Sequence, residues 1–140
     1  MASADAPDPG LARGSSIGGS TRDRGRAVEQ AVAEHLRAHG LEIVQHNFEG
    51  AGAELDLVAR ELAPNGTPIY VFVEVRSRSS SEHGSPLETV DRTKQRRVIR
   101  AATAWLVAHD LWERVEVRFD VVSVEPTELT WIRNAFDLDG

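Results

Sequence analysis

The fold is decided by the stretch IYVFVEVRSR, residues 69–78, which is the most strongly β-prone run in the chain. The turn-rich segment APNGTP at 63–68 comes directly before it, so this strand should follow a hairpin turn. Upstream, LEIVQHNF at 41–48 and AELDLVAR at 53–60 alternate apolar and polar residues, and glycines separate them. This alternation predicts two paired strands, which makes three strands in succession.

Helical patterns lie on both sides of these three strands. From residue 21, apolar residues recur every four positions until Gly40, which has the character of a helix C-cap. A second helix is predicted from about Leu87 to His109, followed by a strand at 115–124 and a short strand at 129–132. Because a strand, a helix and a strand form a crossover unit, the third and fourth long strands should be parallel. The predicted fold class is therefore α/β, with the order α-β-β-β-α-β and a mixed sheet flanked by helices.

Composition limits the class of protein. The 140 residues are 41% hydrophobic and 27% charged, which excludes a collagen-like repeat and a coiled-coil rod. Residues 1–20 are rich in Pro, Gly, Ser and Asp and predict a disordered tail before a single domain at 21–140. No run approaches 18 apolar residues and no signal-peptide pattern is present, so a cytoplasmic protein that does not span a membrane is expected. The absence of Cys excludes disulfides and thiol nucleophiles.

Positive charge is concentrated in one place. The chain has a net charge of -6, yet residues 92–100 alone carry +5. The basic residues of this segment are Arg92, Lys94, Arg96, Arg97 and Arg100. Three of the arginines recur at i, i+4 and i+8 along one helix face, so they offer a surface for the phosphate backbone of a nucleic acid. A solvated helix face explains the same pattern.

Carboxylates interrupt two neighbouring strands of the predicted sheet. Glu54 and Asp56 are two residues apart, so both should project to one face of their strand. Leu55 and Leu57 should project to the other face. Glu74 interrupts the apolar run of the next strand. If the two strands pair through the short turn, Asp56 and Glu74 lie side by side.

Such a pair needs compensating positive charge, because adjacent carboxylates repel one another and burial increases the cost. Arg76 and a divalent cation are the candidates. Hard oxygen ligands suit Mg²⁺ or Mn²⁺, which bind through one or two carboxylates together with a substrate phosphate, and this indicates phosphodiester chemistry. A solvated edge strand with ordinary surface ion pairs explains the same residues. The position of 69–78 between the hairpin and the crossover favours the interior of the sheet.

Seven segments carry a family resemblance. They are Glu29, GAELDL at 52–57, VFVEVRSR at 71–78, GSP at 84–86, Lys94, RFDVV at 118–122 and NAF at 134–136. In this order and spacing, from about residue 25 to 136, the chain resembles the YraN family. Its members are described as uncharacterised proteins with a restriction-endonuclease-like, Holliday-junction-resolvase-like fold of the PD-(D/E)xK class. The implied fold agrees with the order of elements predicted above.

The resemblance implies roles for individual residues. Asp56 corresponds to the metal-binding aspartate and Glu74 to the second acidic ligand. Glu29 corresponds to an additional acidic residue that resolvase-like nucleases use near the metal, and Glu54 to the acidic residue of the family's Gly-Glu-Ile-Asp-Leu motif. The implied cofactor is Mg²⁺ or Mn²⁺, and the implied partner is DNA or another structured nucleic acid. Because resolvases of this fold usually act as dimers, a homodimer is also implied, although no sequence feature marks a dimer surface.

Arg76 departs from the family pattern because it occupies the position of the active-site lysine. A guanidinium with a pKa above about 12 does not act as a base, although it can clamp a phosphate. Arg76 therefore either stabilises the transition state of hydrolysis or makes the site one that binds without cutting. A further alternative is that Lys94, the only lysine in the chain, reaches the site from the second predicted helix.

Three classes of function follow. The leading hypothesis is a nucleic-acid-binding protein that hydrolyses phosphodiester bonds of DNA with Mg²⁺ or Mn²⁺. The alternative is a nucleic-acid-binding or adaptor protein of the same fold that has lost cleavage. The third is an interaction protein whose basic helix face binds an acidic protein.

Histidines give weaker signals. His35 and His39 stand at i and i+4, but they lack the Glu of a His-Glu-x-x-His motif and a third ligand, so surface histidines are favoured over a zinc site. His83 precedes the second predicted helix and could approach a bound phosphate.

Overall fold

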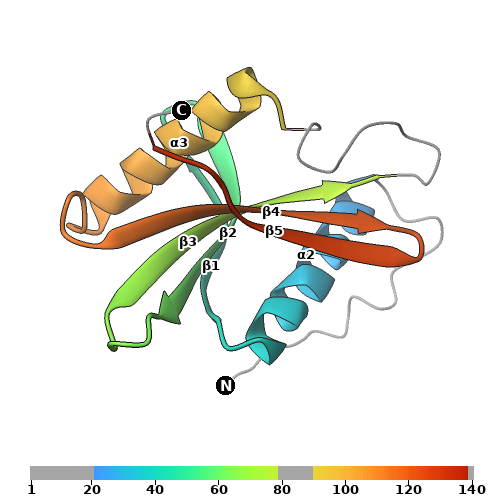
Figure 1. The fold of residues 1–140 in the computed structure, drawn as a ribbon. Helices are drawn as coiled ribbons and strands as arrows, with labels where there is room; N and C mark the ends of the chain where they lie inside the picture. The colour runs from blue at the N-terminus through green and yellow to red at the C-terminus, as the bar shows by residue number, and fades with distance from the viewer. Residues whose placement is uncertain (1–20, 79–89, 139–140) are drawn as a thin grey trace.

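The computed structural model describes residues 21–78 and 90–138, and it contains a mixed five-stranded sheet with a helix against each face (Figure 1). The elements are α2 (Thr21–Ala38), β1 (Glu42–Gly50), β2 (Ala53–Leu62), β3 (Pro68–Ser77), α3 (Arg92–Ala108), β4 (Glu116–Glu125) and β5 (Glu128–Phe136). The predicted α/β class and the order α-β-β-β-α-β are confirmed, with β5 as a fifth strand. The predicted tail at 1–20, GSP at 84–86 and His83 lie outside the described residues.

The strands lie in the order β1-β2-β3-β4-β5. All neighbouring pairs are antiparallel except β3 and β4, which are parallel and joined through α3. The predicted parallel pairing across the crossover is therefore confirmed. The predicted hairpin turn between β2 and β3 is also confirmed, because Ala63 N–H donates to the Thr67 carbonyl at 2.8 Å and Gly66 has a φ of 87°. These pairings place β3 in the interior of the sheet.

The two helices bury separate apolar clusters on opposite faces of the sheet (Figure 1). On the α3 face, Trp105 packs against Phe72 with ring centroids 5.8 Å apart. On the α2 face, Val32 and Leu36 pack with Val71 and other β-branched residues of the strands. The sheet is therefore covered on both sides, so its interior strands are apolar on both faces and any polar residue there needs an explanation.

Helix boundaries follow their capping residues. Gly40 has a φ of 96°, and Leu41 N–H donates to the Leu36 carbonyl at 3.0 Å, which is the C-cap predicted for the first helix. The prediction that the second helix begins at about Leu87 is wrong. Helix α3 begins at Arg92, because Asp91 is its N-cap and accepts a hydrogen bond from Lys94 N–H at 2.9 Å.

The last strand is longer than the predicted segment at 129–132 and extends to Phe136. Its second half contains a register shift opposite β4 and a positive φ of 54° at Asn134. Because both interrupt the alternation of apolar and polar residues, the alternation does not predict this part of the strand. Tertiary contacts hold it in the sheet. Phe136 is buried and stacks on Phe119 with ring centroids 5.0 Å apart.

Candidate active site

Asp56 and Glu74 lie beside each other on β2 and β3. The β2–β3 ladder ends at Leu57 opposite Val73, and one step further brings Asp56 level with Glu74. The two carboxyl groups lie close enough to interact electrostatically, and Asp56 Oδ2 accepts a hydrogen bond from Val75 N–H at 2.8 Å. The predicted juxtaposition of the two carboxylates is therefore confirmed, in the interior of the sheet.

Strand β2 breaks its regular alternation at Asp56. Leu55 packs in the cluster beneath α3, whereas Leu57 packs in the cluster against α2. The prediction that these two leucines share one face is wrong. In place of a further ladder pair, the Asp56 side chain receives the Val75 N–H, so the carboxylate is held where β2 diverges from β3.

Glu29 of α2 joins this pair. Its carboxyl group contacts Asp56 and the side chain of Asn47, and the negative charge of Glu54 repels it. Glu54 is exposed and lies with Glu29 at an open cavity of about 530 Å³. The cavity is lined by Gly25, Arg26, Glu29, Asn47, Phe48, Glu49 and Glu54. All four predicted acidic residues are thus gathered between α2 and the ends of β2 and β3.

Among the described side chains, Lys94 supplies the positive charge closest to Glu74. Its Nζ lies 3.2 Å from Glu74 Oε2, while Arg76 Nη1 lies 3.9 Å from the same oxygen. Lys94 stands one turn before Val98, so it continues the buried stripe of α3 and reaches inward rather than out with the arginines. The structure therefore brings the chain's only lysine to Glu74 from α3, whereas Arg76 lies on β3.

Burial sets the protonation of the cluster. Burial and the neighbouring Asp56 charge raise the pKa of Glu74 to about 7, against the lowering effect of Lys94. Burial and Asp56 also raise the pKa of Glu29 to about 7. The pKa of Asp56 is raised by burial as well, although the Val75 N–H and Lys94 oppose the shift. Three carboxyl groups with raised pKa values are short of compensating positive charge.

Two of these carboxylates are donors of the kind that could hold a hard divalent cation. Carboxylate oxygens on Asp56 and Glu74 are ligands that Mg²⁺ and Mn²⁺ prefer, and both ions usually keep several waters. Among the residues that the structure describes, no three His, Cys, Asp or Glu side chains converge to hold a metal ion. A site built on these two carboxylates with water and a substrate oxygen fits this arrangement better than a cage that includes Glu29.

The outer face of α3 carries exposed arginines next to the site. They are Arg92, Arg96, Arg97 and Arg100. Arg100 Nε donates to the carbonyl of Ala51 at 3.4 Å, which links the helix to the β1–β2 turn. At Gly50 a Cβ atom would come within 2.8 Å of the Phe48 ring and 3.1 Å of Ala104, so the end of β1 lies close against α3. The basic face and the hairpin thus form one continuous surface.

Comparison with known proteins gives the family. A model of the uncharacterised protein family UPF0102 matches residues 28–124. The chain belongs to this family. The resemblance to the YraN family is thereby confirmed, because the two names denote the same family.

Relatives in the UPF0102 family match most of the chain. A UPF0102 protein of Cupriavidus pinatubonensis is 44% identical over 120 residues, covering 86% of this chain and 90% of that protein. One from Ectopseudomonas mendocina is 42% identical over 121 residues, covering 84% and 98%. One from Xylella fastidiosa is 43% identical over 120 residues, covering 84% and 95%. Their names state no activity.

Asn47 is the site residue of this UPF0102 chain that sequence reasoning missed. It contacts the Glu29 carboxyl group and has a positive φ of 51°. A non-glycine residue in this region is uncommon, and asparagine is among the residues that tolerate it best. The segment LEIVQHNF gives no other indication that Asn47 belongs to the site. Its contact with Glu29 arises only when α2 packs on β1.

Proposed function

We propose that this chain is a metal-dependent nuclease that hydrolyses phosphodiester bonds of DNA or another structured nucleic acid. One observation carries the proposal: Asp56, Glu74 and Lys94 come together from β2, β3 and α3, with Lys94 Nζ 3.2 Å from Glu74 Oε2. The family resemblance expects two acidic residues and a lysine at one point. Here Arg76 stands at the lysine position on β3, and the lysine comes from α3 instead.

In this proposal the residues divide the work. Asp56 and Glu74 present oxygens for Mg²⁺ or Mn²⁺, which would polarise the scissile phosphate and lower the pKa of an attacking water. The Lys94 ammonium faces the same oxygen of Glu74 and would stabilise negative charge that develops on the phosphate. Arg76, half-exposed beside it, would clamp a non-bridging phosphate oxygen.

Nucleic-acid binding is proposed for the outer face of α3. Four exposed arginines there form the positive surface of an otherwise acidic chain, and the helix begins directly beside the carboxylate cluster. A phosphate backbone on this face would be held by charge rather than by base contacts. No helix in the described parts of the chain is long and apolar enough to cross a membrane.

The alternative is binding without cleavage. It is favoured by the two cations that already face Glu74 Oε2, because Lys94 and Arg76 compensate part of the charge that a metal would neutralise. In that case the site would hold nucleic acid without Mg²⁺ or Mn²⁺.

Cleavage of labelled DNA tests the two functions. Single-stranded, duplex, flap and four-way-junction DNA are incubated with Mg²⁺ or Mn²⁺ and wild type, Asp56→Asn, Glu74→Gln or Lys94→Ala. We expect metal-dependent cutting that both carboxylate variants abolish and that Lys94→Ala slows by about 10²–10³-fold, the range for removal of one preorganised donor.

Asp110→Asn is the matched control, because this exposed carboxylate at the far end of α3 pairs only with Arg114 in the described residues. It should cut like wild type. Metal-independent binding with no cutting of any substrate would reject the nuclease and support the alternative.

A further inference from the structure

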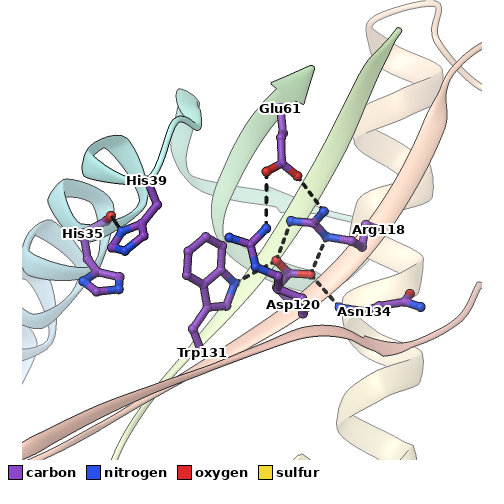
Figure 2. A network of polar contacts seen from close by, with 8 residues as sticks. His35, His39, Glu61, Arg118, Asp120, Trp131 and Asn134 are labelled. Carbon is purple, nitrogen blue, oxygen red and sulfur yellow. Dashed lines mark hydrogen bonds and ion pairs between the residues drawn. The ribbon is translucent and has the colours of Figure 1, made fainter. Parts of the chain in front are cut away.

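Two histidines face each other near the C-terminal end of α2, next to Trp131 of β5 (Figure 2). The ring centroids of His35 and His39 are 4.4 Å apart. Both rings meet the indole of Trp131 edge-on, at 5.9 Å and 5.8 Å. His35 lies six positions after Glu29, which is about 9 Å further along the helix. The pair is therefore separate from the carboxylate cluster.

The tautomer of His39 follows from its hydrogen bond. His39 Nδ1 lies 2.9 Å from the main-chain oxygen of His35. Because a carbonyl oxygen can only accept, Nδ1 carries the proton, and the neutral ring keeps its lone pair on Nε2. Metal-ligating histidines typically donate their other ring N–H to such a carbonyl, which fixes the ring and raises its basicity. His39 thus presents an oriented ligand nitrogen.

The spacing of the two rings suits a shared ion. Histidines at i and i+4 project from one face of a helix, as in helical zinc motifs. With metal–nitrogen distances of about 2.0–2.1 Å, two imidazoles on one tetrahedral ion have ring centroids roughly 5 Å apart. The observed centroid separation of 4.4 Å is close to this value. In the described part of the chain the His35 ring makes no hydrogen bond.

The surrounding charge tolerates a cation. The pair lies at the carbonyl end of α2, where the helix dipole favours positive charge. Arg133 stacks over Trp131 at 3.8 Å, but it is paired with Glu61 at 3.3 Å, so its charge is compensated.

We propose that His35 and His39 form a surface site for a borderline divalent ion, Zn²⁺ or Cu²⁺, with two imidazole nitrogens as ligands and water in the remaining positions. Imidazole nitrogens select these ions over Mg²⁺, so the site differs in chemistry from the carboxylate cluster. Within the described residues no third His, Cys, Asp or Glu completes the site, which leaves open positions on the ion. The site does not depend on nuclease activity.

Zinc titration of the full chain without a histidine tag tests the site. Calorimetry is performed with excess Mg²⁺, which occupies carboxylate oxygens but not imidazoles. We expect one equivalent of Zn²⁺ to bind, with affinity reduced by tenfold or more, on the order of the 10–100-fold loss seen when a metal site is disturbed, in both His35→Ala and His39→Ala. His46→Ala is the control, because this exposed histidine lies on β1 and is not part of the pair, and the variant should bind zinc like wild type.

A second measurement uses Trp131 as a reporter. Bound Cu²⁺ should quench tryptophan fluorescence in wild type and in His46→Ala, because Trp131 touches both rings. Quenching should be lost in the two variants of the pair, provided that circular dichroism shows both to be folded. Zinc affinity and quenching that remain unchanged in both variants would overturn the proposal, as would the absence of binding in wild type.

Discussion

Glu29 illustrates how the carboxylate cluster reduces stability at neutral pH. Its pKa is raised to about 7 in the folded protein by burial and Asp56, above its ordinary value of 4.5. The folded state therefore keeps a proton that the unfolded state releases. The contribution of Glu29 to stability is therefore greatest below pH 4.5 and is lost as the pH rises through 7. Glu29→Gln removes this pH-dependent contribution to stability.

The prediction concerns unfolding by urea without divalent metal. The midpoint of Glu29→Gln minus that of wild type should increase between about pH 5 and about pH 8. Glu34→Gln, at an exposed position of the same helix, is the control and should show no such increase. A difference between Glu29→Gln and wild type that stays constant with pH would contradict the assignment.

Asp120 is the opposite case, a buried carboxylate whose charge is fully matched (Figure 2). Arg118 donates to both of its oxygens, at 2.9 Å and 3.0 Å. Trp131 Nε1 and Asn134 N–H add bonds of 2.9 Å each. Asp120 thereby connects β4 to the irregular half of β5.

Replacing Asp120 by Asn should destabilise the fold by about 3–5 kcal/mol, the usual cost of removing one partner from a buried ion pair. The amide would lose the charge that faces Arg118, and its NH₂ group would meet a donor. Urea unfolding measures the change. Asp110→Asn, whose side chain is 85% exposed, should shift stability by no more than about 0.5 kcal/mol. Equal stability of the two variants would show that the charge of Asp120 does not stabilise the fold to this extent.

At the scale of elements, the alternation of apolar and polar residues predicted most of the strands, and the expected pairing of two of them predicted that Asp56 and Glu74 lie side by side. The run at 69–78 placed Glu74, and pairing with 53–60 brought Asp56 beside it. Lys94 was named from the sequence as an alternative that reaches the site from the second helix, and the structure places it four residues before the buried Val98 with its Nζ 3.2 Å from Glu74 Oε2. The break at Asp56 was not predictable, since Leu55 and Leu57 turn to opposite faces only through contacts with α3 and α2. Tertiary contacts likewise determine the positive φ of Asn134.

The exposed face of α3 makes a prediction about salt. If Arg92 and Arg96 contact phosphates, changing both to Glu should weaken binding of duplex DNA and reduce the slope of log affinity against log salt by about 1 per lost contact. Fluorescence anisotropy over a range of KCl concentrations measures both quantities. Arg114→Glu is the control, because this arginine lies beyond the end of α3 beside Asp110. An unchanged slope in the double variant would place the nucleic acid elsewhere.

At the scale of the whole molecule, the candidate site joins three parts of the fold. Asp56 and Glu74 stand on adjacent strands, Lys94 comes from the helix on one face and Glu29 from the helix on the other. The raised pKa values mean that the folded chain holds these carboxyl groups together at a free-energy cost. A cation that binds only the folded state would offset this cost and stabilise the entire domain.

Thermal unfolding tests this coupling between metal and fold. Millimolar Mn²⁺ or Mg²⁺ should raise the Tm of wild type, and at a concentration of 100 times Kd the gain is about 2.7 kcal/mol. The metal should also reduce the pH dependence of stability, because it favours the ionised carboxylates. Asp56→Asn and Glu74→Gln should show no metal-induced shift, whereas Asp110→Asn should shift like wild type. If the carboxylate variants respond as strongly as wild type, the ion binds elsewhere and the carboxylate cluster owes its charge balance to Lys94 and Arg76 alone.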